Sequence, residues 1–209
     1  MCGGRGTRLD ADVEKPLYPI AGEPMVDRVR RALAGSDVET TYAVVSPNAP
    51  RMREHLAEAG VPPIETPGEG YVADLGRAIA DSRVERPVLT VAADLAALET
   101  TAVNDVLDAY ERYRQEADGN PSTTICVPVA LKERLGLSVD GRLRPDEDSG
   151  IDGPVHVAAD ATADGPLAPT GCNVVGASDI EVIHVSDDPC LAINVNRVED
   201  ARIAEARCA

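Results

Sequence analysis

Residues 88–94 read Val-Leu-Thr-Val-Ala-Ala-Asp, a short apolar run that ends in a carboxylate. A run of this length with β-branched residues indicates a strand buried on both faces of a sheet. Thr100 or Thr101 can cap the segment that follows, in which apolar residues recur at helical spacing. A buried strand followed by an amphipathic helix is the repeating unit of α/β sheets. The stretch therefore predicts an α/β fold with Asp94 at the carboxyl end of a central strand.

The same alternation of apolar runs and helical patterns extends in both directions. Towards the N-terminus we expect helices over 25–33, 51–59 and 72–79, and strands over 42–45 and near Ile64. Towards the C-terminus we expect strands over 123–129, 173–176, 180–185 and 191–195, followed by a helix from Val198. This order predicts a mostly parallel central sheet with helices on both faces.

The length of the chain suits one domain. With 209 residues and 44% hydrophobic content it can build one sizeable core, whereas two domains would be cramped. We therefore expect a single domain over residues 1–209. Within it, residues 140–169 are rich in Asp, Gly, Ala and Pro and lack periodicity, which predicts an irregular insertion or flap.

Charge and cysteine content restrict the partners and the compartment. The net charge of −16 repels nucleic acid and anionic membranes, so neither is an expected partner. Lys15 and Lys132 are the only lysines, which together with the acidity indicates a salt-adapted, halophile-like protein; an ordinary acidic protein is the alternative. The five cysteines are scattered without CxxC spacing, and no apolar stretch approaches the roughly 20 residues of a membrane span. We expect reduced thiols and a cytoplasmic location.

Small and cationic residues gather near the N-terminus, where residues 3–8 read Gly-Gly-Arg-Gly-Thr-Arg and Lys15 follows within Glu-Lys-Pro. A turn of small residues lets backbone amides approach phosphate oxygens and form an anion-binding nest. Arg8 and Lys15 can offset the remaining charge. The spacing matches neither the GxGxxG dinucleotide turn nor the GxxxxGK[ST] loop. The predicted phosphate-binding residues are Gly3, Gly4, Gly6, Thr7, Arg8 and Lys15.

Taken together, the two segments resemble the GGxGTR…EKP signature of the MobA-like nucleotidyltransferases, which activate phosphorylated small molecules with a nucleoside triphosphate. Further segments look like the CobY-type guanylyltransferases of that superfamily: residues 46–50 (SPNAP), 68–75 (GEGYVADL), 93–95 (ADL) and 193–197 (INVNR). The likeness runs, with gaps, over nearly the whole chain except 140–169. It implies a Rossmann-like nucleotidyltransferase fold, GTP as guanylyl donor and adenosylcobinamide phosphate as acceptor in cobalamin biosynthesis.

Asp94 is the predicted ligand of Mg²⁺, and a cap of the next helix is its alternative role. A carboxylate just past a buried strand can hold a divalent cation between phosphate oxygens, and the resemblance gives the matching Asp this function. Either Asn194 or Asn196 should face the same site and complete the metal shell or orient the acceptor. Asn194 is preferred, with Asn196 capping the last helix. Arg8, Lys15 and Asp94 form the predicted catalytic set, without a protein nucleophile.

Two loops supply the predicted nucleotide contacts. Asn48 follows a strand, and its amide can pair with a base or ribose edge or serve only the turn geometry. Thr66, Gly68 and Gly70 lie in a turn before a helix whose first amides are free. We expect this turn to contact the guanine or its ribose, a plain loop being the alternative.

The resemblance also bears on the beginning of the chain and on rival functions. Family members carry an apolar strand directly before the glycine turn, where this sequence has Met1-Cys2, so we expect a truncated first strand lacking about five to eight residues. One rival function is another MobA-like nucleotidyltransferase, acting on molybdopterin or a sugar phosphate. A second is an inactive nucleotide-binding regulator. Family analogy is compatible with a homodimer.

Overall fold

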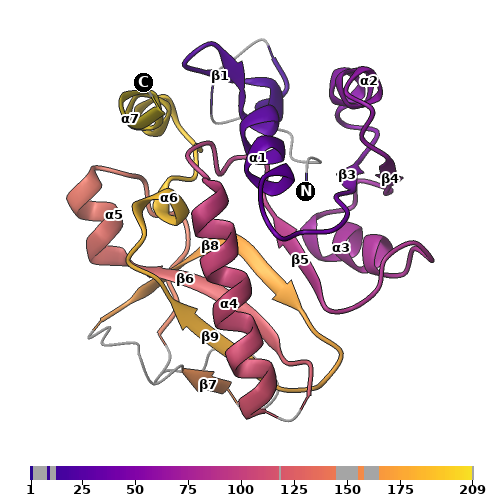
Figure 1. Ribbon diagram of the computed structural model, residues 1–209. Coiled ribbons are helices and arrows are strands. Elements are labelled where there is room, and N and C mark those ends of the chain that lie inside the picture. Colours follow the sequence, from indigo (N-terminus) through magenta and orange to yellow (C-terminus); the bar gives the residue numbers. More distant parts are fainter. Residues whose placement is uncertain (2–8, 10–12, 118, 145–154, 158–164, 209) are drawn as a thin grey trace.

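The strand predicted over 88–92 and the helix after it are both present, but within the described residues this strand lies at one end of the main sheet and not at its centre. The computed structural model describes residues 1, 9, 13–117, 119–144, 155–157 and 165–208. The strand is β5 (Val88–Val91) and the helix is α4 (Thr100–Glu116), which lies across the main sheet in Figure 1. Glu99 occupies the N-cap position of α4 and its side chain makes no capping bond. The Thr100 hydroxyl donates instead to Ala32 O at 3.2 Å, so it ties α4 to a neighbouring helix.

The main sheet is mixed. Within the described residues its strand order is β5-β8-β6-β9-β7, with β6 (Ser122–Pro128), β7 (Val155–Val157), β8 (Leu167–Val175) and β9 (Glu181–Val185). Strand β8 pairs antiparallel with both β5 and β6, whereas β9 pairs parallel with β6 and β7. The prediction of an α/β fold is confirmed, but the prediction of a mostly parallel sheet holds only in part, because β8 is inserted against the direction of its neighbours.

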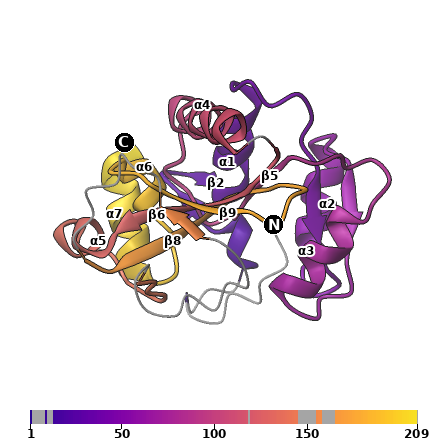
Figure 2. The same ribbon diagram turned by 90° about the horizontal axis from the view of Figure 1, so that it is seen from below.

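A smaller parallel sheet precedes β5 in the chain. It pairs β3 (Ala43–Val45) with β4 (Pro63–Glu65), and the helices that follow these strands are α2 (Pro50–Glu58) and α3 (Tyr71–Ile79). Nearer the N-terminus lie η1 (Lys15–Leu17), β1 (Pro19–Ile20), β2 (Glu23–Pro24) and α1 (Met25–Ala34). Figure 2 shows α2 and α3 together at one end of the molecule, with α1 and α4 on one side of the main sheet.

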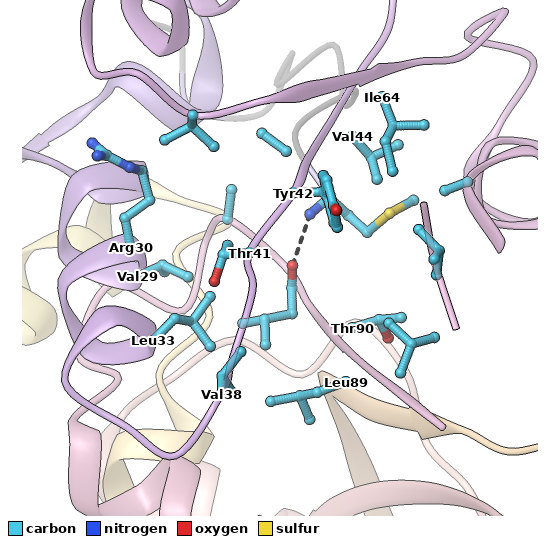
Figure 3. Close-up of a pocket in the computed structure, with 18 of the residues that line it drawn as sticks. Val29, Arg30, Leu33, Val38, Thr41, Tyr42, Val44, Ile64, Leu89 and Thr90 are labelled. Atoms are coloured by element: carbon cyan, nitrogen blue, oxygen red, sulfur yellow. Dashed lines mark hydrogen bonds between the residues drawn. The ribbon is translucent and has the colours of Figure 1, made fainter. Parts of the chain in front are cut away.

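A cavity of about 120 Å³ separates β3 from β5. Apolar side chains from both strands line it, including Val44 and Leu89, which Figure 3 shows on different walls. Met1 also lines this cavity. Its amino group donates to Val91 O at 2.8 Å, and Ala93 N donates to Met1 O at 3.3 Å. This pair of bonds has the pattern of a parallel ladder, so Met1 lies against the edge of β5 that faces β3.

The C-terminal part departs most from the prediction. The strand expected over 191–195 is absent from this described segment, which contains the short helix α6 (Pro189–Ala192). Asp188 caps this helix by accepting from Cys190 N at 2.8 Å, and proline at the first helical position favours the turn. A helix that was not predicted, α5 (Val129–Leu135), directly follows β6. The last helix, α7 (Val198–Cys208), is present as predicted.

The predicted insertion over 140–169 is described only in part, because residues 145–154 and 158–164 lie outside the described residues. Strand β7 belongs to this segment and pairs with β9. Leu143 forms an isolated antiparallel bridge with Leu167, the first residue of β8. The described portion therefore joins the main sheet, while a flap remains a prediction.

The core holds the segments that carry the predicted metal ligands. Leu95 and Ile193 are fully buried beside Asp94 and Asn194, and both belong to the largest apolar cluster of the molecule. Close packing of these neighbours fixes the backbone from which the polar side chains project. Among the helices of the described residues, none combines the length and apolar character needed to cross a membrane.

Candidate active site

Lys15 and Asp94 are far apart in the sequence but meet in the fold. Lys15 Nζ donates to Asp94 Oδ2 at 2.5 Å, and the two side chains are only 17% and 19% exposed. Asp94 lies just past the carboxyl end of β5, as predicted. A charge-assisted bond shielded from water to this extent is stronger and better ordered than an ion pair on the open surface.

The Glu-Lys-Pro segment explains how Lys15 is held. The Glu14 carboxylate accepts from Arg51 N at 2.9 Å and from Met52 N at 2.8 Å, which are amides of the first turn of α2. An acid suits this position because helix N-termini carry partial positive charge. Pro16 is buried within η1, where its fixed φ favours the turn. Glu14 and Pro16 thus anchor the backbone on both sides of Lys15.

Both asparagines of the C-terminal segment face this ion pair. Asn196 Oδ1 accepts from Lys15 Nζ at 2.6 Å, and Asn194 Nδ2 lies 3.4 Å from Asp94 Oδ1. The expectation that one asparagine faces the site while the other caps a helix relied on the alternation of a strand. Residues 193–197 are not a strand, so that alternation does not apply.

The residue that accepts from the backbone amides before α7 is Asp200 and not Asn196. This carboxylate is fully buried and accepts from Asn196 N at 3.1 Å and from Arg197 N at 2.9 Å. It also accepts from the amide and the hydroxyl of Ser138, each at 2.8 Å. A buried carboxylate with four donors fixes the loop that presents both asparagines.

Lys132 belongs to the candidate site, although no sequence motif points to it. This residue of α5 is 4% exposed, and its Nζ donates to Asn194 Oδ1 at 3.1 Å. Burial lowers the pKa of Lys132, and nearby carboxylates, Asp200 foremost, act in the opposite direction. The signal that could have found it is composition: Lys15 and Lys132 are the only lysines in the chain, and both reach this site.

The carboxylate of Asp94 fits a divalent cation. Within the described residues, no three His, Cys, Asp or Glu side chains gather in a metal-binding group. Mg²⁺ commonly binds proteins through one or two carboxylates and takes its other ligands from water and substrate phosphates. Asp94 meets this requirement if it shares or releases its bond to Lys15.

Asn194 is less available as a metal ligand than Asp94, because its amide oxygen already accepts a hydrogen bond. Its Oδ1 accepts from Lys132, and its Nδ2 donates to Thr170 O at 2.6 Å. An ammonium group can only donate, so this contact fixes which end of the amide is oxygen. The oxygen must leave Lys132 before it can bind a metal, and the assignment of Asn194 as a ligand stays a prediction.

A second group of predicted residues lies at the carboxyl ends of β3 and β4. Asn48 Nδ2 lies 3.4 Å from Gly68 O. Gly68 has a φ of 76°, and a Cβ there would lie 2.7 Å from Asn48 Nδ2 and 3.1 Å from Ser46 Cβ, so the turn requires glycine. The buried Thr66 donates its hydroxyl to Val45 O at 3.1 Å. That hydroxyl stabilises the turn, and a nucleotide contact by Thr66 stays a prediction.

The turn continues into α3 through Gly70, whose φ is 121°. The buried Asp74 accepts from Gly68 N at 2.9 Å and so closes the turn. Tyr71 and Val72, the first residues of α3, are exposed large hydrophobic side chains. The turn is thus rigid at its base and open at the start of the helix.

The predicted phosphate-binding turn precedes Lys15 in the chain. Gly3, Gly4, Gly6, Thr7 and Arg8 lie outside the described residues. Their contacts therefore stay a prediction. The described chain becomes continuous again at Val13, two residues before Lys15.

The fold and the site define a class of protein. The family model of the MobA-like NTP transferase domain matches residues 1–174, and the chain belongs to this family. It is therefore a nucleotidyltransferase, and the resemblance carried by the glycine turn and the Glu-Lys-Pro segment is confirmed.

Two individual relatives are similar to this chain over most of its length. The adenosylcobinamide-phosphate guanylyltransferase of Methanocaldococcus jannaschii is 28% identical over 213 residues, which cover 98% of this chain and 93% of that protein. The bifunctional protein GlmU of Mycolicibacterium vanbaalenii is 24% identical over 171 residues, which cover 78% of this chain but only 32% of that protein.

A solved structure of CMP:2-keto-3-deoxy-manno-octonic acid synthetase in complex with CTP has a similar fold. The TM-score is 0.52 at 17% sequence identity, and the match covers 81% of this chain and 70% of that one. At this level of identity the likeness concerns the fold alone.

Proposed function

We propose that this chain transfers a guanylyl group from GTP to adenosylcobinamide phosphate, giving adenosylcobinamide-GDP and pyrophosphate in cobalamin biosynthesis. The observation that carries the proposal is the similarity to the Methanocaldococcus jannaschii enzyme, which extends over nearly the full length of both chains. The meeting of Lys15 and Asp94 beside β5 supports nucleotidyl transfer at this point of the fold. A Rossmann-like arrangement of the sheet and its helices belongs to the same proposal.

In the proposed reaction an oxygen of the acceptor phosphate attacks the α-phosphorus of GTP. The bond from that phosphorus to the β-phosphate oxygen breaks, and pyrophosphate leaves in line. The protein then contributes positioning and charge stabilisation. Lys15, oriented by Asp94 and Asn196, offsets negative charge on the leaving pyrophosphate. The proposed glycine turn, with Arg8, holds the rest of the triphosphate.

Asp94 is the residue that would hold Mg²⁺. When bound, the cation supplies positive charge between phosphate oxygens that otherwise repel each other. Transfer of Lys15 from the carboxylate to a phosphate oxygen would leave Asp94 available. The ion pair between these two side chains thus keeps both groups ordered before substrate arrives.

The nucleoside of GTP is proposed to lie over the predicted residues at the carboxyl ends of β3 and β4. Asn48 offers an amide to a base or ribose edge, Gly68 lets the turn pack closely against Asn48, and Gly70 leaves open space beside the first amides of α3. Thr66 contributes by holding the turn through Val45 O. The preference for guanine and the corrinoid acceptor are taken from the relative alone.

A pyrophosphate-release assay tests the proposal. The chain is incubated in concentrated KCl with Mg²⁺ and each of the four ribonucleoside triphosphates, with and without adenosylcobinamide phosphate. We expect release with GTP only when the acceptor is present, and a loss of release when Mg²⁺ is chelated. Release that requires a sugar phosphate or molybdopterin would assign the chain to another branch of the family. GTP binding without release from any mixture would indicate an inactive regulator.

A further inference from the structure

The two lysines of this chain lie at opposite ends of one row of polar contacts. Lys15 Nζ bonds Asp94 Oδ2, Asp94 Oδ1 faces Asn194 Nδ2, and Asn194 Oδ1 accepts from Lys132 Nζ. These contacts measure 2.5, 3.4 and 3.1 Å in that order. The row runs from Lys15, whose side chain is 17% exposed, to Lys132, which is only 4% exposed.

A lysine in this interior position is costly to the fold. Removing an ammonium group from water is unfavourable unless the protein supplies partners, and a buried ion pair often stabilises less than apolar residues of the same volume. The other buried residues of α5, Val129 and Leu131, are apolar. Stability alone therefore does not account for a lysine here.

The contact with Lys132 bears on the orientation of the Asn194 amide. Because an ammonium group only donates, the amide oxygen of Asn194 must point at Lys132 and its NH₂ group must point away. That NH₂ group donates to Thr170 O at 2.6 Å and lies 3.4 Å from Asp94 Oδ1. Lys132 and Thr170 O thus hold the two ends of the amide, and removing Lys132 would leave the amide oxygen without this donor and Thr170 O alone to hold the NH₂ group that faces the carboxylate.

We propose that Lys132 is a positioning residue for the transfer reaction: it fixes the amide of Asn194, and Asn194 in turn holds the carboxylate of Asp94 in the orientation that binds the cation. The inference rests on the proposed function for its activity readout. Lys132 touches neither nucleotide nor metal in this role. Residues that orient a metal ligand typically change metal affinity or activity by about 10–100-fold when they are removed.

The test replaces Lys132 by methionine, which keeps the length of the side chain and removes its charge and its donors. We expect kcat to fall by about tenfold or more and the half-saturating Mg²⁺ concentration to rise similarly, with little change in KM for GTP. Arg134→Met is the matched control, because Arg134 is an exposed residue of the same helix. Normal kcat and Mg²⁺ dependence in a folded Lys132→Met protein would overturn the proposal.

A double-variant cycle tests whether Lys132 acts through Asn194. If it does, Lys132→Met combined with Asn194→Ala is no more than about twofold worse than Asn194→Ala alone. Effects that multiply would mean that Lys132 acts by another route. If Lys132→Met does not fold, Lys132→Gln takes its place in the cycle and is judged by the same two outcomes.

A binding measurement separates this inference from the proposed function. Mn²⁺ uptake by the wild-type chain and its variants is followed by electron paramagnetic resonance in the presence of a non-hydrolysable GTP analogue. We expect about tenfold weaker Mn²⁺ binding in Lys132→Met and unchanged binding in Arg134→Met. A wild-type chain that binds Mn²⁺ but releases no pyrophosphate refutes the proposed function only. Equal Mn²⁺ binding by wild type and Lys132→Met refutes the role of Lys132 only.

Discussion

At the scale of single residues, the site depends on Lys15 more than on any other described side chain. Its ammonium group bonds Asp94 and Asn196, and Glu14 and Pro16 fix its backbone. One cation thus orders two groups that belong to segments distant in the sequence. We propose that a phosphate oxygen of the nucleotide replaces the carboxylate as the acceptor of the Lys15 ammonium group.

Lys15→Ala is expected to lower kcat by about 100-fold or more, because a charge contact that forms with the leaving group is lost. The measurement is the rate of pyrophosphate release under saturating substrates. Arg202→Ala, which removes one positive charge from an exposed position on α7, serves as the control and should turn over normally. Near-normal turnover of Lys15→Ala would contradict the role assigned to the lysine.

Some contacts of the site could be predicted from the sequence and others could not. Lys15 and Asp94 were predicted because a motif and a strand end point to them. The contact between Lys132 and Asn194 joins residues 62 positions apart, and nothing in either local sequence indicates the other. Only the packing of α5 beside the loop after α6 brings them together. The glycine turn, by contrast, was predicted from its local run of small residues and lies outside the described residues.

At the scale of helices and strands, local pattern predicted most elements but not their directions. Helices α1, α2, α3, α4 and α7 and strands β3, β4, β5, β6 and β9 were located from periodicity. The helix α5 was missed because it begins inside an apolar run directly after Pro128, and an apolar run alone does not distinguish a strand from a buried helix. The reversed direction of β8 depends on sheet pairing, which periodicity does not encode.

We predict that an added strand can fill the cavity between β3 and β5. An engineered extension of five alternating Val and Ile residues before Met1 should continue the ladder that Met1 forms with Val91 and Ala93, and should fill the cavity. Burying this apolar surface is expected to raise Tm, by roughly 2–4 °C for each kcal/mol gained. Thermal unfolding followed by circular dichroism measures the effect.

The control for this extension is a Gly-Ser sequence of the same length. It also moves the charged amino group away from Val91 but supplies no apolar side chains. An equal Tm for the two extended proteins would show that the cavity does not accept a strand.

At the scale of the whole molecule, charge is the dominant feature. The chain carries 36 acidic and 20 basic side chains, a net charge of −16, and most described ion pairs are partly exposed. Exposed pairs contribute little to stability, so they do not offset the repulsion among excess carboxylates. We therefore expect the stability of the fold to depend on its apolar core and on screening by salt.

Raising KCl from 0.1 M to 2 M is expected to increase Tm, because the screening length falls from about 10 Å to below about 3 Å. Differential scanning calorimetry measures the change. A variant with Glu39→Gln, Glu116→Gln and Glu205→Gln, all exposed, should be more stable than the wild type at low salt and respond less to KCl. A Tm that is constant or falls with KCl would refute the salt-adapted interpretation.

The most direct measurement is a crystal structure of the chain with Mg²⁺ and a non-hydrolysable GTP analogue. We predict the triphosphate within hydrogen-bond distance of Lys15 Nζ, and the cation at about 2.0–2.1 Å from an oxygen of Asp94. A triphosphate bound away from Lys15, or a cation that leaves Asp94 without contact, would contradict the assignment of this site to nucleotidyl transfer.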